Sequence, residues 1–217
     1  FTADTLNEYP CTLAPVKVIP YGFPPVREKL AGNSFAGNRP LKLLFVGGVS
    51  QRKGIADLFE AVRKVGRHAE LTIVGNKTTA HCPALDSELV RHKWLPGLPH
   101  NDILALMRES DVLVFPSLFE GFGLVITEAM AQGTPVITTG RTAGPDIIKH
   151  GHNGWLIEAG SAMQLHDTIA GLLAQPEMIA EAGKAAAETA RLRPWTVYGA
   201  ELAAAAAQFN KKQDPNG

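Results

Sequence analysis

The sequence predicts an α/β fold built on a doubly wound parallel sheet of about six strands. Short apolar runs rich in β-branched residues alternate along the chain with segments whose apolar residues recur at helical spacing. Alternation of this kind is typical of right-handed βαβ units, whose ligands bind at the carboxyl ends of the strands. The chain has 217 residues, of which 45% are hydrophobic. This is enough for one such domain with a sizeable core.

The predicted strands are short apolar runs that end close to Gly, Pro or Thr: residues 16–20, 41–47, 70–75, 112–116, 135–138 and 154–157. Helices are predicted where apolar residues recur every three or four positions, at 55–62, 103–107 and 165–173. Two more helices follow at 176–191 and 194–209, and Pro194 marks the break between them. The loops after Val46, Val74 and Phe115 are therefore where a ligand site is expected.

The charge balance favours no polyanionic partner. The chain carries 21 basic and 21 acidic residues, so no net field attracts nucleic acid or an anionic membrane. No apolar run reaches the ~20 residues that span a bilayer. The chain has two cysteines, Cys11 and Cys82, which lie far apart in sequence. This pattern is typical of a reduced cytosolic protein and not of a disulfide scaffold. We expect a cytoplasmic protein with no nucleic-acid partner and no transmembrane segment.

The strongest candidate site is the segment 116–135, PSLFEGFGLVITEAMAQGTP, where a strand gives way to a helix that begins near Gly123. Gly121 and Gly123 lack Cβ atoms, so N–H groups at the helix start can approach a ligand closely, and the helix dipole favours a phosphate there. Glu120 and Glu128 suit sugar hydroxyls, because a carboxylate accepts hydrogen bonds from adjacent hydroxyl groups. A capped helix with an ordinary surface glutamate fits the same residues.

The second candidate site is the segment 46–54, VGGVSQRKG, between a predicted strand and an amphipathic helix. It matches neither the dinucleotide-binding glycine pattern nor the P-loop. Arg52 can fork onto phosphate oxygens and Lys53 can act as a point charge, which suits a pyrophosphate leaving group. A solvated basic turn is the alternative interpretation.

Together these segments resemble the C-terminal domain of the retaining glycosyltransferases called group 1 or family 4. The resemblance runs from about residue 18 to residue 209. It includes VIPYGF, LLFVGGVSQRKGI, ELTIVG, the Glu-x7-Glu segment, AGPDIIKHGHNGWLI and the Trp-bearing last helix, in the family's order. The Glu-x7-Glu segment is the most specific of these motifs. The resemblance implies one half of a GT-B fold, which is a Rossmann-like doubly wound sheet with extra C-terminal helices.

The resemblance also implies roles for individual residues. Glu120 would contact the donor hexose, Glu128 the ribose, and Arg52 with Lys53 the diphosphate, so that Glu120, Arg52 and Lys53 form the catalytic set. The remaining donor-binding positions lie in the glycine turn, in the helix start, or in the loops that flank the base: Gly121, Phe122, Gly123, Leu124, Val125, Thr127, Gly48, Gly75, Trp94 and Leu95.

Three positions depart from the family's commoner residues. Gly47-Gly48 stands where many members have Gly-Arg, so Arg52 has to supply that phosphate contact. Pro96 and Asp146 replace a frequent Gly and a commoner Glu. The identity of the base is therefore left open, and we expect a donor of UDP, GDP or ADP type.

No metal or cofactor is expected. The chain has no Asp-x-Asp run, so the charge of the leaving group would be met by Arg52, Lys53 and the helix N-terminus. The pairs His150/His152 and His81/Cys82 lack the further ligands of a closed metal site.

The expected function is transfer of a hexose from a nucleotide diphosphate sugar to an unknown glycan, lipid or small molecule, with retention, as in polysaccharide biosynthesis. A non-catalytic nucleotide- or sugar-binding module is the alternative, and a GT-B sugar-nucleotide epimerase ranks last.

The expected domain division has four parts: an interdomain connection and lead-in at 1–40 with a helix at 2–9, a nucleotide-sugar-binding domain at 41–193, a C-terminal helix at 194–209 and a disordered tail at 210–217. We expect the N-terminal acceptor domain of the family to be missing from this sequence. We therefore expect the chain alone to be inactive or weakly active. Any peripheral association with the inner membrane would depend on the missing domain.

Overall fold

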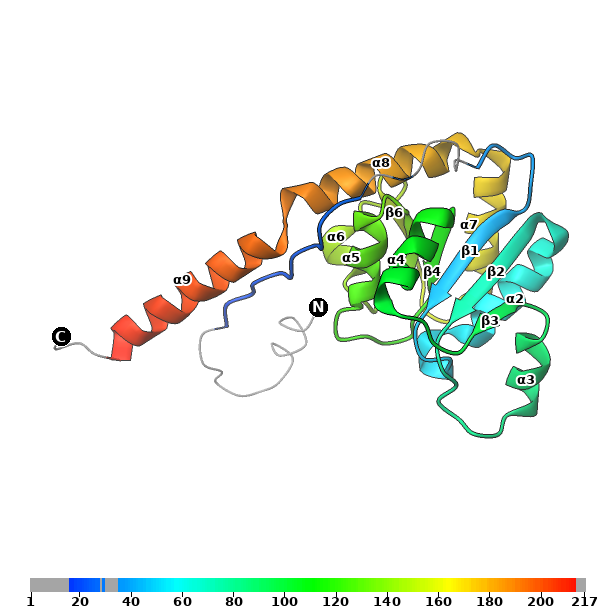
Figure 1. Ribbon diagram of the computed structural model, residues 1–217, viewed down its shortest axis with the longest axis horizontal. Coiled ribbons are helices and arrows are strands. Elements are labelled where there is room, and N and C mark those ends of the chain that lie inside the picture. Colours follow the sequence, from blue (N-terminus) through cyan, green and yellow to red (C-terminus); the bar gives the residue numbers. More distant parts are fainter. Residues whose placement is uncertain (1–15, 28, 30–34, 214–217) are drawn as a thin grey trace.

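The computed structural model describes residues 16–27, 29 and 35–213 (Figure 1). Its centre is a six-stranded parallel sheet with the strand order β3-β2-β1-β4-β5-β6. The strands are β1 (Leu41–Val46), β2 (Ala69–Val74), β3 (Lys93–Leu95), β4 (Val112–Phe115), β5 (Val136–Thr139) and β6 (Gly154–Ile157). The strand order reverses between β1 and β4, which makes their carboxyl ends the expected ligand crevice. The predicted fold class is confirmed.

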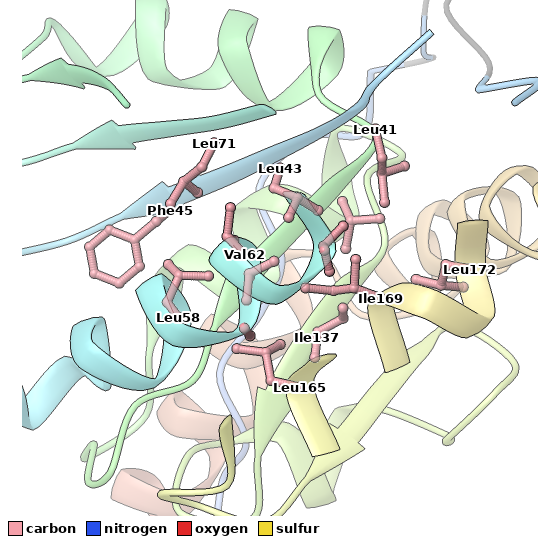
Figure 2. Close-up of a cluster of buried hydrophobic side chains, with 14 of the residues drawn as sticks. Leu41, Leu43, Phe45, Leu58, Val62, Leu71, Ile137, Leu165, Ile169 and Leu172 are labelled. Atoms are coloured by element: carbon pink, nitrogen blue, oxygen red, sulfur yellow. The ribbon is translucent and has the colours of Figure 1, made fainter. Parts of the chain in front are cut away.

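Two hydrophobic cores lie on opposite faces of this sheet, because successive strand residues point to opposite sides. Leu43 and Phe45 of β1 belong to the first core, with α2 (Ile55–Val65) and α7 (Ala162–Ala174); Figure 2 shows how their side chains interdigitate. Leu44 belongs to the second core, with α4 (His100–Glu109), α5 (Leu124–Ala131) and the last turns of α8 (Glu177–Leu192). Both faces of the central strands are buried, so the sheet is a rigid base for the loops at its carboxyl edge.

The shorter elements connect these layers. They are the 3-10 turns η1 (Gln51–Lys53) and η2 (Gly66–His68) and the short helices α3 (Pro83–Leu89) and α6 (Gly144–Ile147). None of the four is predicted from the sequence, and neither is β3. The strand β3, the two 3-10 turns and α6 have three or four residues, too few to show a periodic apolar pattern, and α3 buries only Leu89.

The predicted strand at 16–20 is wrong. These residues form no strand, and the side chains of Val16 and Val18 are 53% and 65% exposed. No strand pairs with them within the described residues. β-Branched residues favour a strand only where they pack against a neighbouring strand, and these residues have none. Further along, Phe23 makes an isolated bridge with Pro194 and donates its N–H to Arg193 O at 2.8 Å.

The chain turns at Pro194 into α9 (Trp195–Gln213), which runs outward from the sheet domain (Figure 1). Tyr21 holds the start of α9, with ring centroids 5.8 Å from Trp195 and 5.3 Å from Tyr198. The helix ends four residues beyond the predicted residue 209, because Lys and Gln are good helix formers and the next Pro is Pro215. The predicted helix at 2–9 and the end of the predicted tail, 214–217, lie outside the described residues, and the domain division stays a prediction.

Candidate functional site

The two candidate segments meet at the carboxyl ends of β1 and β4. The turn η1 follows β1, and the loop 116–123 joins β4 to α5. Leu118 N donates to Arg52 O at 2.8 Å, and Ser117 Oγ donates to the same carbonyl at 3.1 Å. Segments that are more than sixty residues apart in sequence therefore form one surface, at the switch point where a doubly wound sheet binds ligands.

Two glycines allow neighbouring loops at this edge of the sheet to approach closely, Gly54 the two candidate segments and Gly75 the loops after β1 and β2. Gly54 has φ +70°, and a Cβ at this position would lie 2.0 Å from Pro116 O. At Gly75 a Cβ would lie 1.9 Å from Gly47 O. Any larger residue would push the loop backbones apart.

Glu120 forms ion pairs with both predicted phosphate-binding cations. Its Oε1 accepts hydrogen bonds from Arg52 Nη1 at 2.8 Å and from Lys53 Nζ, and Ser117 Oγ lies 3.3 Å away. The side chains of Glu120 and Lys53 are 12% and 13% exposed, whereas that of Arg52 is 57% exposed. Lys53 Nζ also lies 5.0 Å from the centre of the Phe115 ring. The catalytic set predicted from sequence is thus one charge cluster, made of Arg52, Lys53 and Glu120.

The loop after β5 supports the turn that carries Glu120. Arg141 O accepts a hydrogen bond from Glu120 N at 2.9 Å, and Phe122 O accepts one from Ala143 N at 2.8 Å. The buried Thr139 donates through Oγ1 to Ser117 O at 2.6 Å. None of these supporting residues, Ser117, Thr139 and Arg141, is predicted from the sequence. Ser117 and Thr139 are small polar residues at the end of a buried strand or close to it, and Arg141 acts through its backbone carbonyl, which no side-chain pattern reveals.

The start of α5 presents backbone donors. Gly123 is the N-cap, with φ +88° and no side chain to cap the helix, so the first N–H groups of α5 have no acceptor within the helix. Gly121 and Phe122 precede this turn, and Leu124 and Val125 begin the helix. Thr127 is fully buried and donates through Oγ1 to Leu124 O at 2.8 Å. Since the whole residue is buried, the structure does not expose Thr127 to a ligand, and its donor-binding role stays a prediction.

Glu128 lies on α5 and is close to a histidine outside the charge cluster. His100 Nε2, at the start of α4, lies 3.9 Å from Glu128 Oε1. The Glu128 side chain is 24% exposed. Burial raises the pKa of the Glu128 carboxyl above its ordinary value of 4.5, and His100 opposes this shift. A half-buried carboxylate whose burial is only partly compensated is suited to accept hydroxyl hydrogen bonds from a ligand.

Glu128→Gln is expected to raise the melting temperature at pH 7.5. A carboxyl whose folded-state pKa is raised costs stability once pH exceeds that pKa, and this cost vanishes below its unfolded value of 4.5. The advantage of the variant should therefore shrink as pH falls from 7.5 to 4. Thermal unfolding of both proteins across this range measures it, and an advantage that grows with acidification would contradict the assignment.

The predicted base-flanking residues lie at the carboxyl ends of β2 and β3. Trp94 Nε1 donates to Gly75 O at 2.9 Å, and Lys77 Nζ lies 5.7 Å from the Trp94 ring centre. Leu95 follows Trp94 in β3. A Cβ on Gly48 would lie 3.2 Å from Thr78 Cγ2, so this loop is also tightly packed. The structure thus brings Gly75 and Trp94 together in one wall beside the switch point.

Within the residues that the structure describes, no group of three or more His, Cys, Asp or Glu side chains could hold a metal ion. In the same part of the chain, no helix is long and apolar enough to cross a membrane.

A doubly wound parallel sheet with additional C-terminal helices and a cationic, glycine-containing site at its switch point defines the C-terminal half of a GT-B fold. Residues 26–189 match the family described as glycosyl transferases group 1, and the chain belongs to this family.

Named relatives support this membership. The chain is 32% identical over 171 residues to D-inositol 3-phosphate glycosyltransferase of Corynebacterium glutamicum, a match that covers 73% of this chain and 41% of that protein. It is 31% identical over 166 residues to phosphatidyl-myo-inositol mannosyltransferase of Mycobacterium leprae, a match that covers 74% of this chain and 44% of that protein. The chain thus spans less than half the length of these curated relatives.

Solved structures share the fold. Sucrose-phosphate synthase of Thermosynechococcus elongatus aligns with 97% of this chain and 57% of its own, at a TM-score of 0.82 and 23% identity. HepE of Anabaena, solved with UDP-glucose, aligns with 79% of this chain and 50% of its own, at a TM-score of 0.71 and 22% identity. The C-terminal domain of the group 1 protein LpcC of Francisella tularensis aligns with 78% of this chain and 94% of its own, at a TM-score of 0.63 and 23% identity. Because 94% of that C-terminal domain is covered, this chain shares the fold of a C-terminal domain.

Proposed function

We propose that this chain holds the nucleotide diphosphate sugar donor of a group 1 glycosyltransferase, and that the complete enzyme transfers the sugar with retention and without a metal ion. The observation that carries the proposal is the charge cluster of Arg52, Lys53 and Glu120 beside the open N-terminus of α5. Cations and unpaired N–H groups meet a diphosphate, and a carboxylate meets sugar hydroxyls. The relative HepE was solved with UDP-glucose, a ligand of this chemistry.

Each part of the donor has a proposed place. The diphosphate lies between η1 and the start of α5, where Arg52, Lys53 and the N–H groups stabilise the charge that develops on the leaving group. The hexose lies against Glu120 and the 121–123 turn, the ribose against Glu128, and the base against Gly75 and the Trp94–Leu95 wall. The acceptor is left open, since we assign its recognition to the acceptor domain of the complete enzyme, and this chain spans less than half of its relatives.

Calorimetric titration with UDP, GDP, ADP and NAD, each with and without EDTA, tests the proposal. Saturable binding of one nucleoside diphosphate that EDTA does not change is the expected result, and the preferred nucleotide names the base. Binding of NAD alone, or of no nucleotide, would overturn the proposal.

Glu128→Ala is expected to weaken binding of that nucleotide by about 1–3 kcal/mol, the contribution of hydrogen bonds to a charged group. The matched control is Glu109→Ala, which removes an exposed glutamate from the last turn of α4 and should leave the affinity unchanged. Equal affinity of the Glu128 variant and the wild type would remove Glu128 from the ribose site.

A further inference from the structure

One oxygen of Glu120, Oε1, is bound by two cations. It accepts hydrogen bonds from Arg52 Nη1 at 2.8 Å and from Lys53 Nζ. A carboxylate oxygen has two lone pairs, so these two donors fill Oε1, and the single proton of Ser117 Oγ, 3.3 Å away, also lies within reach of Arg52 O and Phe119 O. The carboxylate that we assign to the hexose is therefore already bound by the two cations that we assign to the diphosphate.

A free sugar competes poorly for such a carboxylate. A neutral hydroxyl group that bound at Oε1 would have to replace an ammonium or guanidinium partner, and charge-assisted hydrogen bonds are about twice as strong as neutral ones. Two hydroxyl groups on adjacent carbons need Oε1 as well as Oε2. Lys53 and Glu120 are also largely shielded from water, which strengthens their attraction relative to an exposed pair. A diphosphate, in contrast, is itself an anion and offers both cations several oxygens.

The two cations differ in how freely they can change partner. Arg52 is 57% exposed, so its guanidinium can turn toward a ligand at little cost in packing. Lys53 is 13% exposed and lies over the Phe115 ring, so it can exchange one anion for another only within the site. Glu120 itself is held at its backbone by Arg141 O, at 2.9 Å. The exchange therefore moves the cations, while the backbone that carries Glu120 stays in place.

We propose that the ion pairs of Glu120 with Arg52 and Lys53 are a specificity gate: a diphosphate draws the two cations away, and only then can both oxygens of Glu120 accept hydrogen bonds from the hexose. The gate favours sugars linked to a diphosphate over free hexoses. It rests on the proposed function, because it needs the diphosphate and the hexose to bind as assigned above.

The gate makes a prediction of unusual sign. Glu120→Gln keeps the size of the side chain but releases both cations, so the variant should bind UDP about two- to fivefold more tightly than the wild type, a factor of the size that one ion pair supplies. The same variant should lose most of the affinity that UDP-glucose gains over UDP, and wild-type protein should show no saturable binding of glucose. Calorimetry with UDP, UDP-glucose and glucose measures all three, with the GDP and ADP counterparts titrated in parallel.

Two comparisons separate the gate from a general loss of negative charge. In a Lys53→Ala background, the gate predicts that Glu120→Gln tightens UDP binding by a smaller factor, because one of the released partners is absent. Simple repulsion between Glu120 and the diphosphate predicts an undiminished factor. Glu88→Gln is the matched control, because Glu88 pairs with the exposed Arg63 at 3.4 Å and lies outside the site; it should leave UDP affinity unchanged.

Weaker or unchanged UDP binding by a folded Glu120→Gln protein would overturn the gate while leaving the proposed function standing. If this variant does not fold, Glu120→Asp replaces it, since a shorter carboxylate loosens the same pairs and should tighten UDP by a smaller factor. Wild-type protein that binds none of the nucleotides or their glucose conjugates would overturn both the gate and the proposed function.

Discussion

Gly54→Ala is expected to lower the free energy of unfolding by roughly 3 kcal/mol or more, a loss at the upper end of the usual range for single substitutions. The new Cβ would lie 2.0 Å from Pro116 O, a backbone atom that cannot turn aside. In addition, φ is +70° at this position, which favours glycine. Urea unfolding of the variant and the wild type measures the loss.

Gly151→Ala is the matched control for this substitution. Gly151 has a similar φ of +75°, but a Cβ there meets nothing within 4 Å. Only the backbone cost remains, about 1–2 kcal/mol. Equal losses in the two variants would show that the contact between Gly54 and Pro116 is not tight in solution.

The same contact links the stability of the fold to the site. Gly54 directly follows Lys53, and Pro116 directly precedes Ser117, so the spacing of these two backbones sets the distance from the cations to Glu120. Pushing the loops apart should therefore weaken nucleotide binding even under conditions where the variant remains folded.

The sheet was predictable where strands are buried on both faces. The run at 112–116 consists of consecutive apolar residues, the run at 41–47 is apolar apart from the exposed Lys42, and they form β4 and β1. The run at 16–20 has similar composition but no pairing partner among the described residues, so local propensity alone misleads there. The edge strand β3 has three residues, one of them an exposed Lys, and its pairing with β2 depends on tertiary structure that no local pattern encodes.

The residues of the candidate site were predictable as types but not as contacts. The sequence predicted Arg52, Lys53 and Glu120 one by one, because each follows a buried strand in a loop that contains glycine. Their pairing arises because η1 and the loop after β4 meet at the switch point, 67 positions apart for Lys53 and Glu120. Ser117 and Thr139 were missed because buried hydroxyl groups that brace a loop have no sequence signature of their own.

Lys53→Ala is expected to weaken UDP binding by about 2 kcal/mol, which is roughly thirtyfold, while uridine binding stays unchanged. Lys53 is the more buried of the two cations, at 13% exposed, and its ammonium is positioned by Glu120 and the Phe115 ring. A charge held in this way contributes more than a solvated one. Titration of both ligands into the variant and the wild type measures the difference.

Two further variants decide whether this loss comes from the position of the charge. Arg52→Ala should cost less, about 0.2–1 kcal/mol, because its guanidinium is 57% exposed and screened by water. Lys64→Ala removes an exposed lysine that pairs with Glu60 on α2 and should leave UDP affinity unchanged. If Lys53→Ala weakened UDP and uridine equally, Lys53 would act by holding the loop in place. A loss confined to UDP means instead that its charge acts on the diphosphate, which the assignment of the site to a nucleotide diphosphate sugar requires.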